Sequence, residues 1–204
     1  MAWVPPGKDC GACGLSSCDV FTEAVLQGNK TNADCTFFAA GVSSCRNKTE
    51  YTGTDVTGAK YDFIIHAFPG EPSARKFIVP FRADLVEKWD IKKGDLVTGR
   101  PAGPGCPVYH ALRVLAANPV TGVLECHTVG PLAARKEPSH DVQAYHVHAF
   151  GGIAETVIRP PTLGLRQRFL PGYCMMDLSH TAVVNMVLKK KEGIHVRVED
   201  IRIM

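Results

Sequence analysis

Short apolar runs rich in β-branched and aromatic residues dominate the chain from about residue 60 onward. The first two are residues 61–68 (YDFIIHAF) and 76–81 (KFIVPF). Pro and Gly interrupt the pattern about every 10–20 residues, as they do between short strands. Residues 91–97 should turn into a strand, with Gly94 and Asp95 as the turn. Further strands are predicted at residues 108–116, 123–129, 142–150, 156–158, 182–188 and 195–203. The pattern predicts a mainly β domain that is either barrel-like or a sandwich.

Three segments of this domain need separate arguments. Residues 83–89 (ADLVEKW) have the pattern of one short helix. The apolar run at 182–188 fits a strand or a buried helix, and we prefer a strand. Residues 196–203 alternate apolar and charged positions with a slip near Asp200, which predicts a strand with a bulge.

The N-terminal part has a helical pattern instead. Residues 16–27 predict a short helix, because Ser16 or Ser17 can cap its start and Gly28 follows its end. Phe21, Ala24, Val25 and Leu26 would form its apolar face. Cys18 would then lie at the helix N-terminus, where the helix dipole favours a thiolate.

Four cysteines near the N-terminus follow the spacing C-x2-C-x4-C-x16-C. Four thiolates in so short a span can enclose one soft metal centre, either an iron–sulfur cluster or a zinc ion. Structural zinc sites usually use two C-x2-C pairs, so the single pair here favours iron–sulfur. Gly11 and Gly14 each follow a cysteine and allow tight turns. The four candidate ligands are Cys10, Cys13, Cys18 and Cys35.

This run resembles a known iron–sulfur domain. It is similar to the small domain of the B subunit of Rnf-type ion-translocating oxidoreductases and of the large subunit of the corrinoid iron–sulfur protein. The resemblance covers about residues 1–45 and does not reach the rest of the chain. It implies a low-potential [4Fe–4S] cluster that transfers electrons. The shared pattern is matched at Pro6, Gly7, Cys10, Gly11, Cys13, Gly14, Cys18, Gly28 and Cys35.

These observations predict an α+β chain in three parts. Residues 1–45 would form a cluster module, and residues 46–60, which are polar and rich in Thr and Gly, would form a linker. Residues 61–204 would form the mainly β domain. About 45 residues cannot bury an adequate hydrophobic core, so we expect the cluster to act as the core of the first module.

Charge is distributed unevenly between the parts. Residues 1–50 hold four Lys/Arg and five Asp/Glu, a net −1, whereas residues 51–204 hold nineteen and fifteen, a net +4. A cluster with four thiolates would make the first module more negative, which suits docking to a basic protein surface. The only basic tract, 189–191, is short and lacks aromatic neighbours, so nucleic-acid binding is not indicated.

Other features limit the compartment and the chemistry. No apolar run is long enough to span a membrane, and no secretory signal pattern opens the sequence, so we expect a cytoplasmic protein with reduced thiols. The sequence contains no P-loop, no dinucleotide-binding glycine motif and no G-x-S-x-G motif, and it assigns no catalytic residue.

Two further sets of residues raise the question of a second site. His146 and His148 would share one face of a strand, with His110, Cys126, His127 and His140 in the same half of the chain. These residues could form a catalytic metal site, but no metal-binding motif of fixed spacing supports one, and a polar strand face is the preferred interpretation. The other four cysteines are scattered along the chain, and we expect them to be small buried apolar residues: Cys45, Cys106, Cys126 and Cys174. Cys106 lies in a Gly/Pro loop.

The sequence therefore predicts an iron–sulfur electron-transfer protein or a non-catalytic subunit of an anaerobic oxidoreductase, with a larger oxidoreductase as its redox partner. One alternative is a redox enzyme whose β domain carries its own metal or cofactor site and receives electrons from the cluster. A second alternative is a zinc-stapled binding module without a redox role.

Overall fold

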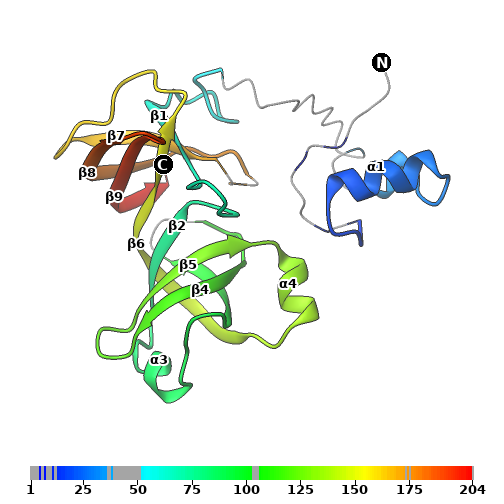
Figure 1. Cartoon of the computed structure of the whole chain (residues 1–204), viewed down its shortest axis with the longest axis horizontal. Coiled ribbons are helices and arrows are strands. Elements are labelled where there is room, and N and C mark those ends of the chain that lie inside the picture. The colour runs from blue at the N-terminus through cyan, green and yellow to red at the C-terminus, as the bar shows by residue number, and fades with distance from the viewer. Residues whose placement is uncertain are drawn as a thin grey trace. The chain divides into compact units, whose positions relative to one another are not determined.

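The computed structural model describes residues 5, 7, 11, 13–35, 38, 52–102, 106–172, 174 and 176–203. The chain divides into two compact units. One contains Met1–Tyr51 with Gly130–Leu132, and the other contains Thr52–Val129 with Ala133–Met204. The N-terminal unit holds the helix α1 (Cys18–Leu26) and the 3-10 helix η1 (Asn32–Asp34) (Figure 1).

The second unit is built on one sheet of nine strands. The short helices α3 (Asp84–Lys88) and α4 (Pro131–Lys136) lie between strands in the sequence. The strands are β1 (Phe63–His66), β2 (Arg75–Pro80), β3 (Leu96–Ala102), β4 (His110–Asn118), β5 (Val123–Val129), β6 (His140–Glu155), β7 (Arg166–Pro171), β8 (His180–Lys190) and β9 (Gly193–Ile203).

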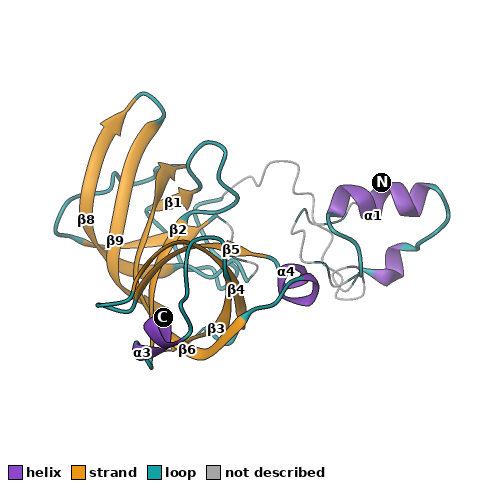
Figure 2. Cartoon of the chain, turned by 60° about the horizontal axis from the view of Figure 1, so that its bottom comes forward, coloured by secondary structure: helices purple, strands orange, loops and turns teal. Residues whose placement is uncertain are grey.

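The sheet closes into two rings of strands that share β6. The first ring runs β6–β1–β7–β8–β9 and returns to β6, and the second ring runs β6–β2–β5–β4–β3 and returns to β6. Strand β6 has 16 residues. Its N-terminal part pairs with β3 and its C-terminal part with β1. Figure 2 shows the second ring nearly end-on.

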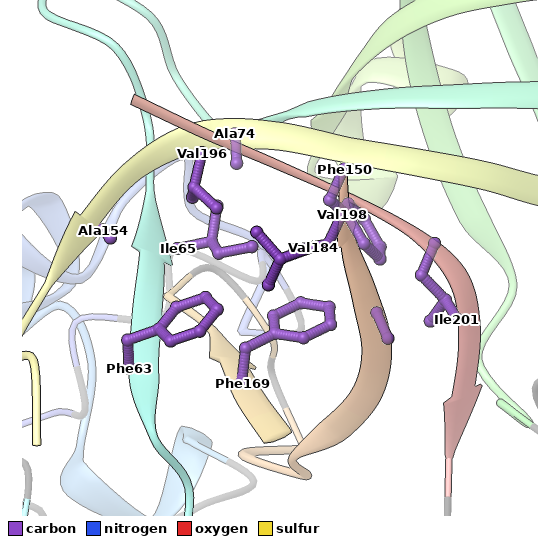
Figure 3. Close-up of a cluster of buried hydrophobic side chains, with 11 residues drawn as sticks. Phe63, Ile65, Ala74, Phe150, Ala154, Phe169, Val184, Val196, Val198 and Ile201 are labelled. Carbon is purple, nitrogen blue, oxygen red and sulfur yellow. The ribbon is translucent and has the colours of Figure 1, made fainter. Parts of the chain in front are cut away.

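Each ring encloses its own hydrophobic cluster. The first cluster contains Phe63 and Phe169, whose rings stack at 6.3 Å between centroids, and Phe150 meets Phe169 edge-on at 5.7 Å. Val184 and Val198 belong to the same cluster. Figure 3 shows the side chains of this cluster pointing toward one another. The second cluster includes Ile78, Val97, Leu112, Leu124, Val142 and Tyr145.

One glycine, Gly152, lets β6 pass close to β1. A Cβ atom on Gly152 would lie 2.1 Å from the carbonyl oxygen of His66 and 2.8 Å from a methyl group of Ile65. A Cβ on the neighbouring Gly151 would meet nothing closer than a ring carbon of Phe77 at 3.8 Å. Gly152 is therefore the position at which the first ring requires a residue without a side chain.

The structure confirms the predicted α+β class, in which a small helical segment precedes a mainly β domain. Strands occur in all the predicted β regions but one, and the ambiguous run at 182–188 is part of β8. The pairing of β8 with β9 shifts register between Thr181 and Val183, opposite Asp200, whose φ is 50°, so the predicted irregularity is present.

Two local predictions differ from the structure. Residues 156–158 are not a strand, because β6 ends at Glu155 and the backbone of Ile158 then bonds to the Asp62 carbonyl oxygen. Strand β7 and helix α4 were not predicted. Gln167 of β7 is only 2% exposed, and this buried polar residue interrupts the apolar alternation that identifies a strand.

Residues 52–60, which we expected to belong to the linker, contact the β domain. Thr54 and Lys60 form an isolated β-bridge, and the backbone N–H of Ser179 donates to the Asp55 carboxylate at 2.9 Å. The division into module, linker and domain stays a prediction.

Candidate metal centre

Cys13 lies in a tight turn formed by glycines. The backbone N–H of Gly14 donates to the carbonyl oxygen of Gly11 at 2.9 Å, with φ of 85° and 69° at the two glycines. This left-handed region is favourable for glycine and costly for other residues. The half-buried Cys13 therefore lies in a turn between Gly11 and Gly14, and the backbone at these two glycines can approach a ligand closely.

Cys18 is the first residue of α1, as the sequence predicts. Ser17 caps the helix, since its hydroxyl oxygen accepts a hydrogen bond from the Val20 N–H at 3.2 Å. The first N–H groups of a helix lack partners within the helix, and the dipole adds positive potential there. Both effects favour a thiolate at Cys18 and an anionic group next to it.

Cys35 follows the short helix η1. The Asp34 carboxylate accepts hydrogen bonds from the backbone N–H of Thr31 at 2.7 Å and from its hydroxyl at 3.1 Å. These bonds hold the pKa of Asp34 below its ordinary value. Cys35 is 7% exposed and its N–H donates to the Asn32 carbonyl oxygen at 3.1 Å.

Three of the four predicted ligands, Cys13, Cys18 and Cys35, are among the described residues. No disulfide links Cys13, Cys18 or Cys35 to another described cysteine. Within the described ranges no three His, Cys, Asp or Glu side chains are grouped closely enough to hold a metal ion. The fourth predicted ligand, Cys10, and the neighbouring Cys45 lie outside the described residues.

The described residues fit an iron–sulfur cluster by their chemistry. Three thiols, one at a helix N-terminus and one in a turn of glycines, supply soft anionic ligands and backbone N–H donors. The sequence family described as "Putative Fe-S cluster" matches residues 6–37, a span that includes all four predicted ligands. This match supports an iron–sulfur domain in the N-terminal segment.

The whole chain has a relative in a methanogen. It is 30% identical over 214 residues to "Uncharacterized protein MJ0119" of Methanocaldococcus jannaschii, an alignment that covers 95% of this chain and 90% of that protein. The chain belongs to the same family as MJ0119. No solved structure matches the chain. The alignment therefore includes most of the N-terminal segment and most of the β domain of this chain.

The predicted apolar face of the N-terminal helix is smaller than expected. Phe21 is 1% exposed and is the buried residue of α1, whereas Leu26 is 83% exposed. Helix α1 ends before Gly28, whose N–H donates to the Val25 carbonyl oxygen at 3.1 Å. With one buried aromatic residue, α1 has little hydrophobic stabilisation of its own, which agrees with a module that depends on its cluster.

The histidines predicted to share a strand face do so, but they belong to no group of metal-binding side chains among the described residues. His146 and His148 both lie on the exposed face of β6, and the His146 ring lies 4.5 Å from that of Phe81. His140 stacks on Trp89 with 5.7 Å between centroids. These contacts direct the rings to separate aromatic partners.

The remaining cysteines take different environments. Cys126 is fully buried in the second hydrophobic cluster, as the sequence indicates. Cys106 and Cys174 are half-buried. In the part of the chain that the structure describes, no helix is long and apolar enough to cross a membrane.

Proposed function

We propose that the chain is an electron-transfer protein or subunit that carries one [4Fe–4S] cluster on Cys10, Cys13, Cys18 and Cys35. The match of an iron–sulfur family to residues 6–37 supports this most directly. The cluster, when bound, supplies a centre that accepts and releases one electron. We infer that the protein works in the cytoplasm as part of a larger anaerobic oxidoreductase.

The chain's own residues would tune this centre. Thiolates from Cys13 and Cys18 would hold it, and the N–H groups of the glycine turn and of the helix N-terminus would stabilise its negative charge. Hydrogen bonds and partial charges of this kind, together with solvent exposure, set the reduction potential of iron–sulfur clusters.

Exposed carboxylates beside the site would guide a redox partner. Asp19 and Glu23 are both exposed and lie one turn apart on α1, so they share a face of the helix. Asp34 lies next to Cys35. A basic patch on a larger oxidoreductase would complement this acidic surface and raise the rate of association.

The metal content tests the proposal. Protein purified without oxygen should contain about four iron atoms per chain and show the electron paramagnetic resonance signal of a reduced [4Fe–4S] cluster. Cys13→Ala should remove both, whereas the control variant Cys174→Ala should keep them. One zinc ion per chain, with no iron, would overturn the proposal in favour of a zinc-stapled binding module.

The docking surface needs its own experiment. Charge reversal of Asp19 and Glu23 to Lys should slow electron transfer to the native partner at low salt while the cluster spectrum stays unchanged. The difference should shrink near 0.1 M salt, where the Debye length is about 10 Å. Reversal of Glu87 and Glu192, two exposed residues of the β domain, is the matched control. Equal electron-transfer rates for the two double variants would show that the partner does not dock on the face of α1 that carries Asp19 and Glu23.

A further inference from the structure

The hairpin of β8 and β9 extends beyond the backbone that covers its outer side. Among the described residues, β7 pairs with β8 at residues 180–183. The segment before β7 adds one further position, because the Gly164 N–H donates to the Val184 carbonyl oxygen at 2.7 Å and the Val184 N–H donates to that of Leu165 at 3.0 Å. Strand β9 continues to pair with β8 as far as Lys190. Figure 2 shows the turn of this hairpin projecting from the first ring.

Residues 186–190 of β8 are therefore paired on one side only within the part of the chain that the structure describes. Lys190 and Gly193 pair across a two-residue turn, and the pair next to such a turn exchanges both of its backbone hydrogen bonds. Because hydrogen-bonded pairs recur at every second position of an antiparallel ladder, the N–H and C=O groups of Val187 and Lys189 point away from β9. An outward row of backbone groups is a template for one more strand.

The two ends of this free edge differ in character. Leu163 and Leu165 are exposed beside the backbone that meets Val184, and Leu188 is exposed on β8 itself. At the tip of the hairpin, residues 189–191 are three exposed lysines. A strand added along the edge would therefore meet apolar side chains at the base of the hairpin and positive charge at its tip.

The charge at the tip favours one kind of partner. The next residue, Glu192, is the one carboxylate of the turn, and its oxygen lies 3.9 Å from the His195 ring nitrogen. Three lysines against one glutamate leave the tip positive. Lysines on an edge strand oppose pairing between two copies of the same chain, because their like charges repel. An acidic segment would instead be attracted to them.

We propose that the free edge of β8, residues 186–190, binds an extended acidic segment of a partner protein as an added β-strand. Backbone hydrogen bonds to Val187 and Lys189 would supply affinity, and the lysines at the tip would select for carboxylates. The exposed carboxylates of α1 suit a basic partner, so the two surfaces would take partners of opposite charge. The inference does not rest on the iron–sulfur function.

A designed peptide tests this surface on the full chain. The probe is a fluorescein-labelled peptide of alternating Val and Glu, about eight residues long, because that pattern suits a strand with one charged face. Fluorescence anisotropy at low salt should show saturable binding with a Kd below about 1 mM. A peptide of alternating Val and Lys is the charge control and should bind at least about tenfold more weakly.

A backbone-modified peptide distinguishes strand addition from simple ion pairing. N-methylation of alternate residues of the Glu peptide removes N–H donors from one edge while its charges stay the same. This peptide should bind at least about tenfold more weakly than the unmodified one. The unmodified peptide should also slow solvent exchange of the Val187 and Lys189 amide protons, which nuclear magnetic resonance follows. Equal binding of the two peptides would overturn the inference.

Charge variants locate the binding to the hairpin. Reversal of Lys189 and Lys190 to Glu should weaken binding of the Glu peptide at least about tenfold at low salt. The matched control reverses Lys88 and Lys93, two exposed lysines near α3 in the second ring, and should bind as the wild type does. Far-UV circular dichroism checks that each variant is folded. Equal loss of binding in both double variants would show only a general effect of charge and would overturn the inference.

A proline variant tests the backbone groups directly. Lys189→Pro removes an N–H that points away from β9, a position at which an edge strand tolerates proline, so the hairpin should persist while peptide binding falls. Sedimentation of the wild-type chain tests the other occupant. A dimer that the Glu peptide dissociates would assign the edge to a second copy of the chain and overturn the proposal of an acidic partner.

Discussion

Asp55 accepts two hydrogen bonds from Ser179, one from its backbone N–H at 2.9 Å and one from its hydroxyl. The two residues are 124 positions apart. Asp55 lies just before the first strand, and Ser179 lies just before β8, so the contact joins the start of the β domain to its last hairpin. Burial alone would raise the pKa of Asp55, but bonds from Ser179, Thr57 and Ala59 outweigh it and hold the pKa well below its ordinary value.

Asp55→Asn should destabilise the β domain by about 1–3 kcal/mol at pH 7, because an amide accepts these hydrogen bonds more weakly than a carboxylate. Urea unfolding followed by circular dichroism measures the change. The matched control is Asp90→Asn, since Asp90 is 87% exposed and should change stability by less than about 0.5 kcal/mol.

The same carboxylate predicts a pH dependence. Its folded pKa lies below the unfolded value of about 4, so the stabilisation is fully present above pH 4 and is lost as the pH falls further. The wild-type chain should lose stability in that acidic range, and Asp55→Asn should lose less. Parallel curves for the two proteins would show that Asp55 is not the group responsible.

Gly152→Ala should destabilise the domain by about 2–3 kcal/mol, because the new Cβ would clash with the His66 carbonyl oxygen at 2.1 Å. Gly151→Ala, one residue earlier on the same strand, has only a 3.8 Å contact and should cost less than about 1 kcal/mol. Thermal unfolding of the two variants gives the comparison. A similar loss in both would indicate a general glycine effect of β6 rather than close packing against β1.

The β domain should fold without the cluster module. Both hydrophobic clusters lie between Phe63 and Ile201, so a chain of residues 52–204 retains every residue of either cluster. Far-UV circular dichroism of this fragment should show the same β signal as the intact protein. An unfolded or aggregated fragment would mean that the predicted division into module, linker and domain is incorrect.

Ser17→Ala should weaken the N-terminal end of α1 by about 1 kcal/mol, because the Val20 N–H loses its 3.2 Å partner. A loosened helix should release iron to a chelator about fivefold faster, which absorbance at visible wavelengths follows over time. Ser16→Ala changes an exposed residue next to the cap and should leave the rate near wild type. Equal rates of iron release from the two variants would show that the Ser17 cap does not contribute to retention of the cluster.

Local patterning predicts most strands, since their apolar residues alternate or cluster between turn residues. Closure of two rings around β6 is not predictable in this way, because it depends on which distant strands pair. Strand β7 was missed for a local reason. Gln167 is buried there with its amide bonded to Pro160 and its oxygen to Thr162, so a satisfied polar residue replaces an apolar one.

The candidate metal centre is predicted by cysteine spacing alone, because its ligands are close in sequence.

The shared strand β6 also couples the two rings thermodynamically. Opening the first ring would remove β1 and β9 from β6, and opening the second would remove β2 and β3, so either event exposes backbone groups that also support the other ring. The amide protons in the middle of β6 should therefore exchange with solvent only through global unfolding, and the two hydrophobic clusters should behave as one foldon.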